Sequence, residues 1–145
     1  MEDLQAPKKY VCKKEVMATP MTRQEYNTYR GWQLPADEHG SDEGYLVEYL
    51  DGGTSNHDNH KGYISWSPKE VFDNGYTDIS TAKGRLCVER NELSVRFEGL
   101  KALLLNEVRP AFISPAQWNM MIEQHAHMRR YLAVLENRIE YFDAV

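Results

Sequence analysis

The sequence predicts an α+β protein in which a small antiparallel sheet with two short helices precedes a long antiparallel α-helical hairpin. Two observations predict this class. Apolar residues of the first half alternate with a period of two, whereas those of the second half recur every three or four residues. We therefore divide the chain into a disordered tail (residues 1–8), a small α+β module (residues 9–80) and a helical hairpin (residues 81–145) that serves as an oligomerisation element.

The module is expected to begin with a strand over residues 9–16, with Tyr10 and Cys12 on one side. Thr22 and Glu25 have the spacing of a capping box, which predicts a short helix from there to Arg30. Gly31 suits the left-handed conformation that often follows a helix.

Residues 33–43 contain Pro35, Gly40 and four acids, so we expect a solvated loop. The next strand covers residues 45–49 and the return strand residues 63–66, as an antiparallel hairpin with a long polar tip. A second capping box at residues 67–70, with Pro68 at the first helical position, predicts a brief helix that ends at residues 74–75.

The hairpin has the strongest pattern in the chain. Its first helix carries a stripe from Leu86 to Leu104 and is expected to end at residues 109–110, followed by a loop of about six residues. Ser114 begins a third capping box, after which apolar positions repeat without a break. Those positions are Trp118, Met121, His125, Met128, Leu132, Leu135, Ile139 and Phe142. Apolar residues off this seam, including Tyr131 and Val134, favour a homo-oligomer, most simply a dimer.

Composition excludes several classes. The formal charge of -5 argues against coating a nucleic acid polymer, and the sequence has no apolar run of membrane-spanning length or export signal. We expect a soluble protein that is not exported and does not associate with membranes, with Cys12 and Cys87 reduced and in the core.

Catalysis and metal binding find little support. The insert at residues 56–60, with two histidines and an aspartate, lacks the further ligands of a zinc site and is interpreted as a solvated tip. His125 is expected to be a hydrogen-bonded core histidine. With no nucleophile motif or glycine-rich phosphate loop in the sequence, we predict no enzyme activity, no metal and no cofactor.

Aromatic and basic residues of the module suggest a ligand site instead. A π-face can stack on a base while a cation holds a phosphate, and a helix N-terminus at Ser67 could add backbone amides. The alternative is that these rings form the core. The candidate ligand-binding residues are Arg23, Tyr26, Arg30, Trp32, Tyr63, Trp66 and Lys69.

Three segments carry a resemblance to known proteins. MTRQEYN (residues 21–27) continues to RGW (residues 30–32) and is followed by DEGYLVEY (residues 42–49) and YISWSPKEVF (residues 63–72). Together they resemble a small module of tailed-phage accessory proteins. Gly31-Trp32, the turn at Asp51-Gly52 and Trp66-Ser67 are similar in order to features of the Thoeris anti-defence type 2 proteins. That resemblance implies a sponge for immune signalling nucleotides.

The second half resembles another phage family. RNEL (residues 90–93) and MRRYLAVLENRI (residues 128–139) are similar to the helical-hairpin family named after a crAss-like phage protein. Both resemblances together imply a phage or prophage origin.

We predict a phage counter-defence protein that sequesters a small anionic nucleotide, such as a cyclic ADP-ribose variant or a cyclic oligonucleotide. The alternative is an inhibitor that binds a host defence enzyme or effector directly, through its acidic loop or its exposed helical face. A purely architectural oligomer is a third possibility.

Overall fold

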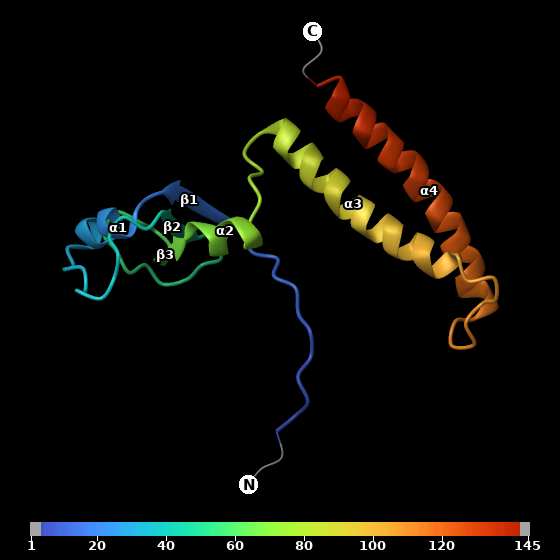
Figure 1. The fold of residues 1–145 in the computed structure, drawn as a ribbon, viewed down its shortest axis with the longest axis horizontal. Coiled ribbons are helices and arrows are strands. Elements are labelled where there is room, and N and C mark those ends of the chain that lie inside the picture. The colour runs from blue at the N-terminus through green and yellow to red at the C-terminus, as the bar shows by residue number, and fades with distance from the viewer. Residues whose placement is uncertain (1–3, 143–145) are drawn as a thin grey trace. The chain divides into compact units, whose positions relative to one another are not determined.

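The chain forms two compact units, described separately below (Figure 1). The computed structural model describes residues 4–142. Unit 1 comprises Met1–Tyr76 and unit 2 comprises Thr77–Val145. The α+β class is confirmed, with a small antiparallel sheet and short helices in unit 1 and two long helices in unit 2.

Unit 1 is built on a three-stranded antiparallel sheet in the order β1-β2-β3. Its strands are β1 (Val16–Pro20), β2 (Gly44–Tyr49) and β3 (Ile64–Pro68). Helix α1 (Arg23–Arg30) packs on the face that carries Leu46, through a core of Tyr26, Leu46 and Ile64. Helix α2 (Lys69–Gly75) lies on the other face, where Phe72 contacts Tyr45. Neighbouring strand residues point to opposite faces, so the sheet separates the two helices.

The first strand begins later than the sequence predicts. Residues 9–15 form no regular structure, and Val16 is the first residue paired, opposite Tyr49. Tyr49 ends β2, so residues before Val16 have no strand beside them to complete a ladder. Tyr10 and Cys12 are consequently exposed, and the expectation that Cys12 is a core residue is wrong.

Helix α1 has the ends that the sequence predicts. The Thr22 hydroxyl accepts a hydrogen bond from the Glu25 amide, and Gly31 adopts φ 72° after the last turn. The loop over residues 33–43 packs on this helix, because its carbonyls at Asp42 and Gly40 accept from the amides of Arg23 and Gln24. These amides would otherwise lack intrahelical partners. Apart from Leu34 and Gly40, which are partly buried, the residues of this segment are exposed, as expected of a solvated loop.

Helix α2 lacks the predicted capping box. Ser67 belongs to β3, Pro68 stands at the N-cap, and no side chain caps the helix. The Lys69 amide instead donates to the Glu43 carbonyl at 3.0 Å. Ser67 and Pro68 pair with Tyr45 and Gly44 of β2, so the predicted cap residue Ser67 is part of the sheet.

Unit 2 is an antiparallel hairpin of α3 (Ala82–Leu104) and α4 (Pro115–Glu140), seen side by side in Figure 1. Thr81 and Ser114 cap the two helices through their hydroxyls, the second as predicted. The described residues contain no helix that is both long and apolar enough to span a membrane. The seam consists of the buried residues Leu86, Leu93, Phe97, Met128 and Leu135, with Leu100, Leu132 and Ile139 partly buried against them.

Two details of the hairpin differ from expectation. Helix α3 ends at Leu104, earlier than predicted, and residues 105–114 form a longer loop. The Asn106 side chain there donates to the Leu103 carbonyl, and Arg109 donates to the Ile113 carbonyl. His125 stacks on Phe97 with ring centroids 4.6 Å apart, but its Nε2 atom is buried without the expected hydrogen-bond partner.

Leu135→Ala should destabilise unit 2 by about 2–5 kcal/mol, because it leaves a cavity in the seam. The Leu135 side chain is only 1% exposed. Denaturant unfolding followed by far-ultraviolet circular dichroism measures the change. Val95→Ala is the matched control, since Val95 is 74% exposed and should change stability by less than about 0.5 kcal/mol. Equal effects of the two substitutions would contradict this seam.

Candidate ligand-binding cavity

A cavity of about 830 Å³ lies in unit 1 between α1 and β3. It contains six of the seven ligand-binding residues that the sequence suggests, drawn from α1, the segment after it, β3 and the residue just before β3. The full lining is Arg23, Tyr26, Asn27, Arg30, Trp32, Gln33, Pro35, Glu38, Asn56, Tyr63, Ile64, Ser65 and Trp66.

Helix α1 supplies one wall because its spacing puts four lining residues on a single face. Arg23, Tyr26, Asn27 and Arg30 follow at steps of three, one and three, which is one stripe of a helix. After Gly31 the chain turns back, and the Trp32 amide donates to the Asn27 carbonyl at 2.8 Å. This turn places the Trp32 ring edge-on to Tyr26, with centroids 6.0 Å apart.

Each arginine of the cavity stacks on a tryptophan. The guanidinium carbon of Arg23 lies 4.4 Å from the centroid of Trp66, and that of Arg30 lies 4.4 Å from the centroid of Trp32. Such stacking holds a guanidinium in place without neutralising it. The Trp66 indole in turn donates to the Met21 carbonyl at 2.7 Å, which fixes its ring.

The two arginines differ in their charge partners. Arg23 lies 3.6 Å from a carboxylate oxygen of Glu38 and 3.5 Å from one of Asp42. In contrast, Arg30 forms no salt bridge with any residue in the range 4–142. One nitrogen of each guanidinium, Nε of Arg23 and Nη1 of Arg30, is buried without a hydrogen-bond partner. A buried polar group normally has such a partner. Arg30 is therefore the cation of the cavity that can bind an anion.

The aromatic residues of the cavity divide into core and surface rings. Trp32 is 52% exposed and Tyr63 is 47% exposed, so both can stack on a ligand. Tyr26 is buried with Leu46 and Ile64, and this burial raises the pKa of its hydroxyl above the usual range although Arg30 acts against the shift. Tyr26 thus supports the wall as a neutral core residue.

Lys69 is the candidate that the structure places elsewhere. Its ammonium pairs with Asp73 at 2.7 Å and lies 5.8 Å from the centroid of Tyr45, on the α2 face of the sheet. The hydrogen bond to Asp73 raises the pKa of Lys69 and lowers that of Asp73. The predicted helix N-terminus at Ser67, which was expected to add amides to the site, is occupied by the sheet.

Asn56 is a lining residue that sequence reasoning missed as a site residue. Its side-chain amide donates to the Ile64 carbonyl at 2.8 Å, and its side-chain oxygen accepts from the Ile64 amide at 2.7 Å. The insert at residues 56–60 is therefore anchored on β3 at one end. Asp58 and Asn59 are exposed as expected of a solvated tip, but Asn56, His57 and His60 are not.

His60 fixes the other end of this insert through a relay of hydrogen bonds. The Tyr29 hydroxyl lies 2.6 Å from His60 Nε2, and His60 Nδ1 lies 2.5 Å from Glu48 Oε1. The simplest network has Tyr29 donating to Nε2 and Nδ1–H donating to the carboxylate. The hydrogen bond from His60 lowers the pKa of Glu48, and the Gly62 amide adds to this. None of these three residues lines the cavity.

The described residues contain no group of three or more His, Cys, Asp and Glu side chains that could hold a metal ion. The cavity instead combines exposed rings with the Arg30 guanidinium, which has no carboxylate partner among residues 4–142. That combination defines unit 1 as a small α+β module with a site suited to a small anion that carries a ring.

Comparison with known proteins places a match on unit 2. Residues 80–141 match the protein family described as Sequestin. The matched segment is less than half of the 145 residues and covers α3 and α4. No curated protein and no solved structure was found to match the chain. The Thoeris anti-defence and crAss-like phage resemblances are not confirmed by this match and stay predictions.

Glu48→Gln should make unit 1 less stable at neutral pH but not at acid pH. A lowered pKa means that the carboxylate stabilises the fold above its unfolded pKa, and that this stabilisation is lost as the pH falls through the folded pKa. Melting temperatures of both proteins should therefore converge on acidification from about pH 7 to about pH 3. Glu15→Gln, at an exposed acid, is the control. A constant difference across this range would contradict the relay.

Proposed function

We propose that the protein binds and sequesters a small signalling nucleotide without converting it. The observation that carries this proposal is the Nη1 atom of Arg30, buried without a hydrogen-bond partner beside the exposed ring of Trp32. A nucleotide supplies both groups that this pair lacks, a phosphate for the guanidinium and a base for the indole.

The family match supports a sequestering role. The name Sequestin denotes sequestration, and the matched residues 80–141 make up the hairpin. The finer identity rests on the sequence resemblances, which suggest a phage counter-defence protein acting in the host cell cytoplasm. We propose a cyclic ADP-ribose variant or a cyclic oligonucleotide as the ligand.

The residues that line the cavity favour binding of the ligand over its chemical conversion. The lining residues include no histidine and no cysteine, and Glu38 is already 3.6 Å from Arg23. Nucleophilic catalysis needs a nucleophile with a base in hydrogen-bond reach, and the histidine of the Tyr29 relay lies outside the lining. We propose that the ligand leaves the site chemically unchanged.

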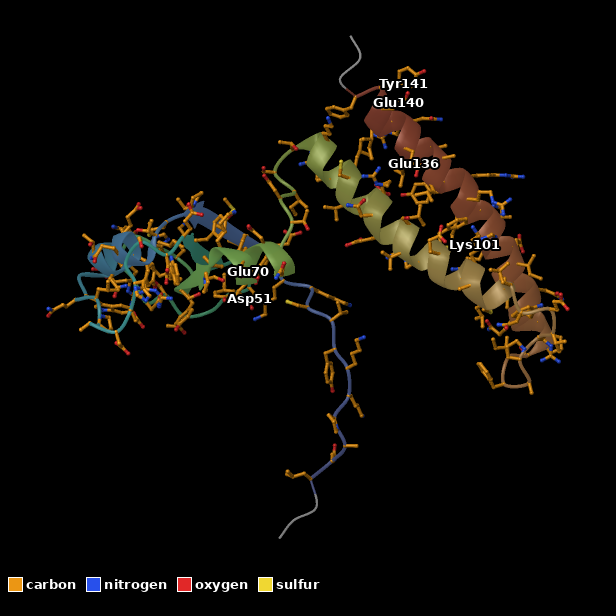
Figure 2. All side chains as sticks on the ribbon, in the orientation of Figure 1. Asp51, Glu70, Lys101, Glu136, Glu140 and Tyr141 are labelled. Carbon is orange, nitrogen blue, oxygen red and sulfur yellow. The ribbon has the colours of Figure 1, made fainter. Side chains whose placement is uncertain are left out.

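We further propose that the hairpin mediates a homo-oligomer. A second stripe on α4 follows the helical repeat away from the seam and includes Met120, Tyr131, Val134 and Tyr141, all exposed. A groove of about 440 Å³ lies along it, lined by Met120, Glu123, Gln124, His127, Met128 and Tyr131. Tyr141 follows the last turn of α4, where Figure 2 labels it beside Glu140. A second copy of the hairpin would cover this apolar stripe, as in a four-helix bundle.

Arg30→Ala and Trp32→Ala should each weaken nucleotide binding by about tenfold or more, because they remove the anion partner and a stacking surface. Isothermal titration with a panel of cyclic ADP-ribose isomers and cyclic oligonucleotides measures the affinity. Lys69→Ala is the matched control, since Lys69 is a cation of the same unit outside the cavity.

Unchanged affinity in both variants would show that the nucleotide does not bind in this cavity. Heating the complex and analysing the released ligand by mass spectrometry tests the absence of turnover. A chemically altered nucleotide would show an enzyme.

Val134→Glu should dissociate the oligomer, because a carboxylate in the apolar stripe would be buried against the second copy. Analytical ultracentrifugation measures the mass in solution. Ile122→Glu is the control, since Ile122 is half-exposed on the same helix but off the stripe. A monomeric native protein would refute the oligomer directly.

A further inference from the structure

Strand β3 and the residue before it, Tyr63, line the cavity. It is an edge strand, with β2 on one side only. Four consecutive residues, 63–66, line the cavity. Side chains of consecutive strand residues point to opposite faces of a sheet, so the four line one cavity only because it runs along the open edge of the strand.

The direction of each peptide group on this edge follows from the antiparallel ladder. The Tyr49 amide donates to the Tyr63 carbonyl at 3.0 Å, so the polar groups of Tyr63 face β2. Peptide groups alternate between the two sides of a strand, and those of Ile64 face outward. There the carboxamide of Asn56 binds both the N–H and the C=O of Ile64.

Trp66 repeats the outward orientation two residues later. It stands opposite Leu46 in the register, in the same alternation as Ile64 opposite Glu48. Within residues 4–142 no backbone or side-chain group forms a hydrogen bond with the N–H or C=O of Trp66 outside the sheet. Trp66, which lines the cavity, therefore has an adjacent backbone donor and acceptor that no group among residues 4–142 binds outside the sheet.

We propose that the N–H and C=O of Trp66 bind the edge of a nucleobase through two hydrogen bonds, as those of Ile64 bind the Asn56 carboxamide. The inference rests on the proposed function and adds that the protein recognises the base of the nucleotide. Every nucleobase has a donor next to an acceptor on at least one edge, which matches this pair of groups. The same chemistry occurs in a carboxamide such as that of nicotinamide. We assign the site to a base because the exposed rings of Trp32 and Tyr63 offer stacking surfaces on the same cavity.

Three mononucleotides and one sugar phosphate test this on the full-length, ¹⁵N-labelled protein by nuclear magnetic resonance titration. Adenosine 5′-monophosphate should shift the Trp66 amide resonance. Purine riboside 5′-monophosphate lacks the 6-amino donor and should bind about 3- to 10-fold more weakly, the loss expected for one hydrogen bond. Nicotinamide mononucleotide tests whether a carboxamide binds in place of a base. Ribose 5-phosphate tests the binding of the phosphate and sugar without a base.

The outcomes separate the two proposals. If adenosine and purine riboside monophosphates bind equally well, or the Trp66 amide does not move, base reading at Trp66 is wrong while nucleotide binding stands. If nicotinamide mononucleotide binds more tightly than adenosine monophosphate, the occupant is a carboxamide, which also overturns the assignment to a base. If no probe binds, base reading at Trp66 is wrong, and the titration with cyclic ADP-ribose isomers and cyclic oligonucleotides decides the proposed function separately.

An amide-to-ester substitution at Trp66 tests the donor directly. It replaces the N–H by an oxygen and leaves the side chain in place. Adenosine monophosphate should lose about 3- to 10-fold in affinity, whereas ribose 5-phosphate should bind as before through Arg30. Equal losses for both ligands would show a structural role of this peptide group and would overturn the proposal.

Discussion

The cavity depends on the way Ile64 is held. Its side chain is 1% exposed and packs with Tyr26 and Leu46, which fixes α1 against the sheet. Its backbone N–H and C=O are both bound by Asn56, which ties the long insert to the edge of β3. One residue therefore joins the helix that supplies the cations to the strand that supplies the opposite wall. The relay from Tyr29 through His60 to Glu48 braces the same insert from the α1 side.

Features of the site could be predicted from the sequence where the interacting residues are close together in the chain, and not where they are far apart. The ends of α1 were correct because a cap is decided within a few residues: Thr22 binds the Glu25 amide and Gly31 takes a positive φ. Lys69 was misplaced because local spacing suggested a cap at Ser67, whereas pairing with the distant β2 put Ser67 into a strand. Asn56 and His60 were missed because their partners Ile64 and Tyr29 are eight and 31 residues away. Polar residues in an insert give no signal of such long-range bonds.

The hairpin shows the same distinction. Its seam was predictable because a single neighbouring helix is enough to bury the apolar repeat of α4. Met128 and Leu135 of this repeat are buried in the seam. The end of α3 was not predictable from Pro110, because the helix stops before the proline is reached and the loop closes on its own carbonyls through Asn106 and Arg109. A proline limits how far a helix can extend but does not decide where it ends.

Charge determines how a sponge of this composition could hold its ligand. The formal charge of -5 disfavours a long-range approach of nucleotides, and Arg23 is offset by Glu38 and Asp42. Arg30 acts only at short range, since charge effects fade over about 8 Å at physiological ionic strength. Association would therefore gain little from electrostatic steering. Tight binding would have to come from slow release, supplied by stacking on the exposed rings of Trp32 and Tyr63 and by hydrogen bonds in the cavity. Slow release is what sequestration requires, because a captured signal must stay bound longer than its effector takes to respond.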